Sequence, residues 1–234
     1  MRKLIVSLLV LLIAAVAADF VAARVFESRV AEELGRRYEI QGRPIVQVRD
    51  FPFLPHLLAG RLTTVDLAAR DVRDRGTTVS RVEVHLHDVA IPRSVMLGNG
   101  GQVRVGHADG EATIAAAELN RLVADRLQGG SLELTDGGVR LGVRTSVLGR
   151  PLDATLIARV GAVNGRIVLQ PTDVQVQSPA GGSLPPAVHA ALLRQFGFPI
   201  PLPRLPAGIQ VERVVTQPGF LTVAGEASAI RLPA

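Results

Sequence analysis

Two histidines on one predicted strand come closer than any other residues of this chain to a metal-binding pattern. His85 and His87 flank Leu86, and because side chains alternate along a strand, both histidines share a face with Glu83. A two-ligand zinc site could begin there, but no third ligand follows at a metal-binding spacing. Polar residues that alternate outward from a half-buried strand explain the pattern without a metal. We therefore expect no metal and no other cofactor.

The remaining histidines, His56, His107 and His189, are isolated from any serine or aspartate in a known nucleophile motif. The sequence contains no Gly-x-Ser-x-Gly, no Gly-x-x-x-x-Gly-Lys and no Asp-x-Asp. The glycine-rich segment 98–101 predicts a turn and not a phosphate loop, because no helical pattern follows it. We expect no catalytic residue and predict that the protein is not an enzyme.

Large apolar residues, in contrast, gather around prolines in two segments. The first, DFPFLPHLLAGRL at 50–62, contains Phe51, Phe53, Leu54, Leu57 and Leu58. Its prolines, Pro52 and Pro55, are expected to prevent a regular helix or a central strand. In the second segment, Phe196 precedes FPIPLPRLP at 198–206, which contributes Phe198, Ile200 and Leu202. Closely spaced prolines there predict an extended, polyproline-like course without ladder hydrogen bonds.

These two segments allow two interpretations. Both could be loops that bury themselves against the core, which is the interpretation that the residues alone favour. Alternatively, they could form the mouth of a lipid tunnel, where stiffened apolar segments touch acyl chains or a membrane surface. The site that the second interpretation predicts consists of Phe51, Phe53, Leu54, Leu57, Leu58, Phe196, Phe198, Ile200 and Leu202.

The N-terminus has the pattern of an export signal. Arg2 and Lys3 precede an apolar run, 4–18, whose alanine-rich end fits cleavage after Ala17 or Ala18. The run is shorter than the roughly 20 residues that span a bilayer. Apolar character resumes at 20–23, so an uncleaved membrane anchor remains the alternative. We therefore expect a signal peptide at 1–18 and a single domain at 19–234, in the periplasm or cell envelope.

Composition excludes several classes of function. The chain has 234 residues, of which 47% are hydrophobic, enough for one substantial core or two small ones. Only 3% are aromatic, so the chain has few aromatic faces for sugars or single-stranded nucleic acid. Its net charge is +5, but the arginines are scattered and form no basic block, so we expect no nucleic-acid partner. Without cysteine, the protein has neither disulfides nor thiolate metal ligands.

Helical and strand periodicities predict an α+β fold. Helices are expected at 19–38, where Asp19 could be the N-cap, at 116–127, and from Ser183 to Phe196. Between them apolar residues alternate with polar ones over long runs, with turns at 136–138 and Asn164-Gly165, which predicts a mainly antiparallel sheet. Alanines thin its apolar face, which could leave a cavity, although small residues equally permit close packing.

Four stretches resemble the LmeA-family phospholipid-binding proteins of actinobacterial cell envelopes, formerly a domain of unknown function. They are an AAD-x-x-A helix start at 17–22, FPFL-x-x-LLAG at 51–60, EATIAAAELNRL at 111–122 and IPLPRLPAGIQV at 200–211. The second is the most specific of the four. Pro55 and His56 depart from the threonine and glutamine common in that family, which puts a polar head-group contact there in doubt.

The resemblance implies a tubular lipid-binding (TULIP-like) fold, in which a curved antiparallel sheet wraps on two or three helices around an apolar cavity. It also implies a function: binding, and potentially transfer, of a phospholipid or polyprenyl-type lipid that supports lipoglycan (mannan) elongation or envelope maintenance. A membrane surface would then be a partner. The competing hypotheses are a non-catalytic accessory subunit of an envelope glycosyltransferase and, more weakly, a lipid or glycan hydrolase using His56 or His107.

Overall fold

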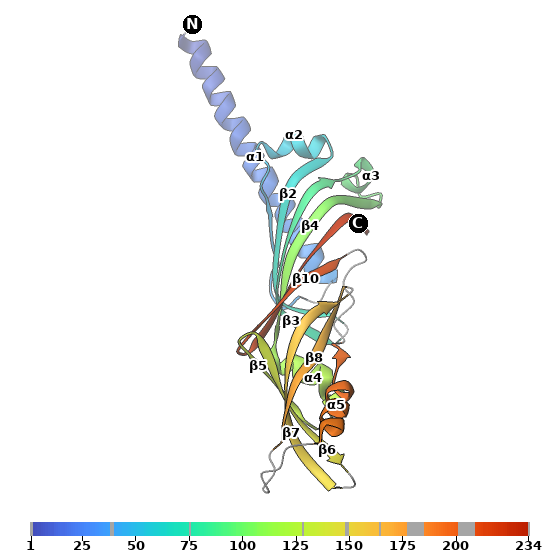
Figure 1. The fold of residues 1–234 in the computed structure, drawn as a ribbon. Helices are drawn as coiled ribbons and strands as arrows, with labels where there is room; N and C mark the ends of the chain where they lie inside the picture. The colour runs from blue at the N-terminus through green and yellow to red at the C-terminus, as the bar shows by residue number, and fades with distance from the viewer. Residues whose placement is uncertain are drawn as a thin grey trace. The chain divides into compact units, whose positions relative to one another are not determined.

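A computed structural model describes residues 2–37, 40–74, 76–127, 129–147, 150–163, 165–176, 185–200 and 209–233 (Figure 1). The helices are α1 (Arg2–Arg37), α2 (Phe53–Leu58), α3 (Arg93–Met96), α4 (Ala116–Leu127) and α5 (Pro186–Gln195). The strands are β1 (Ile45–Val48), β2 (Arg61–Asp74), β3 (Thr77–Ala90), β4 (Gln102–Ala115), β5 (Ser131–Thr135), β6 (Gly138–Val147), β7 (Arg150–Val163), β8 (Arg166–Val176), β9 (Phe198–Pro199), β10 (Gln210–Gln217) and β11 (Phe220–Pro233).

The fold is α+β with antiparallel strands, as the periodicity predicts, and the strands form two unclosed sheets. One sheet has the order β1-β2-β3-β4-β11-β10 and the other the order β5-β6-β7-β8-β9. The predicted hairpins are confirmed: Thr135 pairs with Gly138 across Asp136-Gly137, and Val163 pairs with Arg166. Gly137 has a φ of 70°, the left-handed conformation that such a tight turn requires.

Backbone contacts divide the chain into two compact units. Unit 1 comprises residues 1–72, 82–110 and 227–234, and unit 2 comprises residues 73–81 and 111–226. Each unit has its own hydrophobic core: Phe53, Leu62 and Val105 belong to that of unit 1, and Leu141, Leu156 and Leu169 to that of unit 2. The prediction that 19–234 is a single domain stays a prediction.

Helix α1 joins the predicted export signal and the predicted first helix without a break. The described side chains before Asp19 are exposed, whereas Asp19 itself is buried. By length and composition, α1 could cross a membrane, a property that signal sequences share. Asp19 lies inside this helix, so the prediction that it caps the helix is wrong.

The prediction that Pro52 and Pro55 exclude a helix is also wrong, because α2 occupies 53–58. Pro52 stands at the N-cap in an extended conformation, outside the helical residues. Pro55 is the third helical residue, where a backbone N–H has no partner within the helix, so its absence removes no hydrogen bond. The carbonyl with which its ring would clash belongs to Phe51, which precedes the helix.

The second proline-rich segment is partly a strand. Phe198 pairs with Leu169 and Pro199 with Val168, and the Ile200 N–H donates to the Ile167 carbonyl at 2.9 Å. The expected absence of ladder hydrogen bonds is therefore wrong at 198–200, because the prolines alternate with residues that can still donate. Before it, α5 starts at Pro186; Ser183, its predicted cap, and Leu202 lie outside the described residues.

Three residues other than glycine have positive φ inside strands of unit 1: Asp71 in β2, Asp88 in β3 and Ala229 in β11. Left-handed residues within a ladder are typical of β-bulges, which bend a strand and increase its twist. Figure 1 shows β2 and β4 curving.

Candidate functional site

The FPFL segment is held by a buried carboxylate on α1. Asp19 accepts hydrogen bonds from the backbone N–H groups of Phe53, at 2.8 Å, and Leu54, at 2.7 Å. These are the first two helical N–H groups of α2, which lack partners within the helix. Pro52, at the N-cap, has no side chain that could accept them. Asp19 therefore caps α2 from a distant part of the chain, and links two of the motifs in the sequence.

One face of α2 belongs to the core of unit 1. Phe53 is 1% exposed, and its ring lies 5.4 Å from that of Phe26 on α1. Leu54 and Leu57 are half-buried and pack against the same cluster. These three predicted site residues thus line the interface between α2, α1 and the sheet.

The other predicted residues of this segment face outward. Phe51 is 60% exposed and Leu58 is 72% exposed. The ring of Phe51 lies 5.8 Å from that of Phe20, which is exposed on α1. Large apolar side chains that remain in water mark interaction surfaces when they gather in one place. Part of the predicted site is therefore available to an apolar partner.

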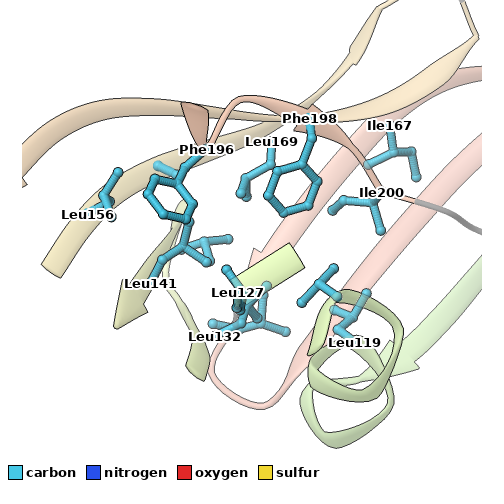
Figure 2. Packing of buried hydrophobic residues seen from close by; sticks show 14 of the residues in the cluster. Leu119, Leu127, Leu132, Leu141, Leu156, Ile167, Leu169, Phe196, Phe198 and Ile200 are labelled. Atoms are coloured by element: carbon cyan, nitrogen blue, oxygen red, sulfur yellow. The ribbon is translucent and has the colours of Figure 1, made fainter. Parts of the chain in front are cut away.

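The second group of predicted site residues lies in unit 2 and is buried. Phe196, Phe198 and Ile200 belong to one cluster with Leu141, Leu156 and Leu169 (Figure 2). Leu192 of α5 and Leu119 of α4 belong to the same cluster. Close packing of this kind stabilises unit 2, and a wall around an acyl chain would have the same composition. The lipid-binding role of this group stays a prediction, as does that of the first.

A polar network lies on the sheet of unit 1, on strands β2 to β4. Asp66 accepts a hydrogen bond from Arg49 Nε at 2.5 Å and lies 2.8 Å from His85 Nδ1. The bond to Asp66 raises the pKa of His85. Burial acts to raise the pKa of Asp66, but the hydrogen bonds from His85 and Arg49 outweigh it and lower that pKa. The pair therefore favours a charged imidazolium beside a carboxylate.

The histidines of this face do not converge on a metal site. His87 bonds with Asp109 at 3.2 Å, and its ring stacks at 6.0 Å on that of His107. Among the described residues, no group of three or more His, Cys, Asp or Glu side chains could hold a metal ion. His56 Nδ1 lies 2.6 Å from the Pro52 carbonyl, four residues earlier, which ties it to its own turn.

The EATIAAAELNRL stretch carries a second polar clamp, in unit 2. Asn120 on α4 donates to the carbonyls of Ala116, at 3.0 Å, and Leu132, at 2.6 Å, and accepts from the Leu132 N–H at 2.7 Å. Glu118 accepts from the Thr78 N–H at 2.8 Å and pairs with Arg121. The bond from Arg121 lowers the pKa of Glu118. The helix is thus fixed to β5 on one side and to β3 on the other.

Sequence reasoning missed the roles of Asp19 and Asn120. Both are polar residues within helices, and both satisfy backbone groups that belong to other elements. Their position inside the AAD-x-x-A and EATIAAAELNRL stretches was the one sign in the sequence that they have a specific role. Pairing them with Phe53 and Leu132 required the tertiary structure.

Two surface hollows lie away from the predicted lipid residues. One, of about 480 Å³, is lined by Ala31, Glu32, Gly35, Arg36, Ile40, Gly42, Arg43 and Pro44 in unit 1. The other, of about 230 Å³, is lined by Gly129, Gly130, Ser131, Gly142, Val143, Arg144, Asp153, Ala154 and Thr155 in unit 2. Charged groups and backbone line much of both, so neither is the apolar cavity that the family resemblance implies.

Comparison with known proteins gives one match. Residues 17–226 match the model of a family described as LmeA-like phospholipid-binding. No curated protein and no solved structure matches the chain significantly. The matched range begins at the alanines that precede Asp19 and ends within β11, so it includes both polar clamps and both apolar segments.

Proposed function

Because the chain belongs to the LmeA-like phospholipid-binding family, we propose that it is an exported, non-catalytic protein that holds a phospholipid or polyprenyl-type lipid in the cell envelope. The single observation that carries the proposal is the family match over most of the chain. The exposed Phe51 and Leu58 and the aliphatic cores of both units agree with it.

Apolar contact alone would supply the affinity. Each acyl methylene that leaves water contributes about 0.8 kcal/mol, so a lipid chain needs few polar contacts to bind. Apolar side chains that could contact an acyl chain are present in each unit. In unit 1, α2 presents Leu54, Leu57 and Leu58, and unit 2 has Phe196, Phe198 and Ile200. Within each unit, acyl chains would replace part of the contacts that these residues make with their own core.

Helix α1 supports an envelope location. It could be a signal sequence or an uncleaved anchor, and either would direct the chain out of the cytoplasm. In the envelope, the bound lipid would support lipoglycan (mannan) elongation or envelope maintenance, with transfer between membranes as an extension of binding. A non-catalytic role agrees with the histidines, which bond to carboxylates or to a neighbouring carbonyl.

A second candidate is an accessory subunit of an envelope glycosyltransferase. The exposed apolar residues around α2 favour it, because a protein partner could cover them as well as lipid could. In that case the chain would carry no stoichiometric lipid.

Mass spectrometry of lipid that co-purifies with the envelope form of the protein separates these functions. We expect about one phospholipid or polyprenyl-type lipid per chain, in proportions unlike those of the bulk membrane. An equally tagged, unrelated exported protein controls for lipid carried by detergent. A lipid profile that matches this control would refute the proposal and leave the accessory-subunit function.

A further inference from the structure

Several large apolar side chains of unit 1 remain exposed close to one another. They come from α1, from the residues just before and at the end of α2, and from the end of α3 and its C-cap. These residues, here called the apolar rim, are Phe20, Phe51, Leu58, Met96 and Leu97. Leu58 and Leu97 are the most exposed, at 72% and 75%. Figure 1 shows α2 and α3 at one end of the sheet of unit 1, and the N-terminal half of α1 projecting past that end.

Specific backbone contacts fix the three segments of the apolar rim to one another. Asp19 joins α1 to the first turn of α2 through its two hydrogen bonds. At the other end of α2, the Gly60 carbonyl accepts from the Ile91 N–H at 2.8 Å, directly before α3. Gly60 has a φ of 71°, and an added Cβ would lie 2.8 Å from the Ile91 carbonyl oxygen. These contacts hold the three segments in fixed positions, so the apolar rim is one defined surface and not a set of unrelated loops.

The charge of the two rim segments that contain α2 and α3 has one sign. Between residues 51 and 62 and between 91 and 101, Arg61 and Arg93 are the charged residues, and both are exposed. The acidic neighbour Asp50 accepts hydrogen bonds from the Thr63 N–H, so it faces its own turn. Arginine beside exposed apolar side chains is suited to the boundary between acyl chains and anionic head groups.

The rim also continues the apolar surface of α1. The exposed apolar residues of α1 extend from Ile5 to Val25 and include Phe20, whose ring lies 5.8 Å from that of Phe51. A helix of this length and composition can lie in a bilayer. If α1 lies in a bilayer, it would leave the hydrocarbon region of that bilayer at the level of α2. A lipid surface, and not a folded partner, fits this continuity.

We propose that the apolar rim inserts into the surface of an anionic phospholipid bilayer, with Arg61 and Arg93 at the head groups. The rim would keep unit 1 against the membrane from which lipid is taken or to which it is delivered. The inference rests on the proposed envelope function for its setting, but it does not require a lipid inside the protein.

The sequence contains no cysteine, so a single introduced cysteine can be labelled specifically. Full chains carrying Leu58→Cys or Leu97→Cys are labelled with an environment-sensitive fluorophore and reconstituted in vesicles of phosphatidylcholine and phosphatidylglycerol. Ile45→Cys is the matched control: Ile45 is apolar, 59% exposed and in unit 1, and pairs with Ala68 of β2. Ala68 lies seven residues beyond Arg61, about 23 Å along the strand.

Nitroxide-bearing lipids should quench the labels at 58 and 97 about twofold or more and leave the label at 45 unchanged. Equal quenching at all three positions would overturn the proposal. The proposal would also be overturned if the fluorescence of the labels at 58 and 97 changes with protein concentration but not with the nitroxide-bearing lipids. That outcome would indicate contact with a second copy of the chain. Unchanged quenching in purely zwitterionic vesicles would overturn the part assigned to the arginines.

Lipid carried by the same preparations distinguishes this inference from the proposed function. If the rim labels remain in water while each chain still holds phospholipid, the rim proposal fails and the proposed function stands. If the rim labels are quenched and no lipid co-purifies, the proposed function fails and the membrane contact stands.

Discussion

At the scale of single residues, buried or half-buried carboxylates organise unit 1. Asp19 and Glu27 both extend from α1 to backbone N–H groups of other elements, Glu27 to that of Val48 at 2.9 Å. A carboxylate accepts such bonds more strongly than a neutral group, and leaving the donors without it exposes them to an apolar surrounding. Much of the docking of α1 therefore depends on two side chains.

Replacing Asp19 should weaken unit 1 substantially. Asp19→Ala removes the acceptor for two N–H groups at the start of α2 and should cost about 2 kcal/mol, whereas Asp19→Asn keeps one oxygen and should cost about half as much. Thermal unfolding measures both. Glu33→Ala is the control, because Glu33 is exposed on the same helix. Equal melting temperatures for all three variants would show that α2 needs no cap.

The His85–Asp66 pair should make stability depend on pH in a defined direction. Because the pKa of His85 is raised above its ordinary value of 6.5, the pair stabilises the fold fully below about pH 6.5 and less as pH rises through the raised pKa. Because the pKa of Asp66 is lowered below 3.8, the same contribution is lost in strong acid. Between these limits, His85→Asn should be less stable than the natural chain, by under about 1 kcal/mol since His85 is 48% exposed.

Urea unfolding at about pH 5 and about pH 9 measures this difference. At alkaline pH, His85→Asn should match the natural chain. Arg49→Gln is the control, because an arginine stays charged throughout and its loss should cost nearly the same at both values. The opposite trend for His85→Asn would mean that the imidazole is neutral in the folded state. Replacing His85 and His87 together by asparagine should leave bound lipid unchanged, since neither is assigned to the site.

At the scale of elements, periodicity predicted most strands and located α4 at its observed bounds, 116–127. The prediction failed at α2, because the rule that proline breaks helices was applied without regard to where in the helix each proline lies. Proline breaks the interior of a helix, but Pro52 and Pro55 lie before and within the first turn of α2, where no N–H is needed. The stabilising carboxylate belongs to α1, so local sequence could not reveal that the helix forms.

Removing the Asn120 clamp should loosen α4 from β5. Asn120→Ala deletes three hydrogen bonds to Ala116 and Leu132 and should cost about 2 kcal/mol, although alanine itself favours the helix. Thermal unfolding and amide exchange at Leu132 measure the loss. Asp125→Ala, on an exposed position of the same helix, should not destabilise. If both variants unfold alike and Leu132 stays protected, the clamp is not needed.

At the scale of the whole molecule, the α+β class and the family could be predicted from the sequence, because hairpin turns, alternation and the FPFL-x-x-LLAG stretch are local signals. The two units could not, since β2, β3, β4 and β11 each carry residues of both and no linker marks a boundary. Burial of Phe53 and Phe196 also depends on distant elements. These residues can bind lipid only if an acyl chain can replace some of the apolar contacts that they make in the core.

Two substitutions on α2 should separate lipid contact from core packing. Leu57 is half-buried, so Leu57→Glu should lower retained phospholipid strongly, by about 2–3 kcal/mol of binding, because its charge would lie beside acyl chains. Its melting temperature should fall little, since the carboxylate can turn toward water. Phe53→Leu, at a position that is 1% exposed, should act mainly on stability: it leaves a void in the core and lowers the melting temperature, while the position stays apolar and loses much less lipid than Leu57→Glu does. Phospholipid per chain and thermal unfolding are measured on both variants. If Leu57→Glu unfolds in proportion to the lipid it loses, then α2 is a packed helix of the core and these residues are not a lipid site.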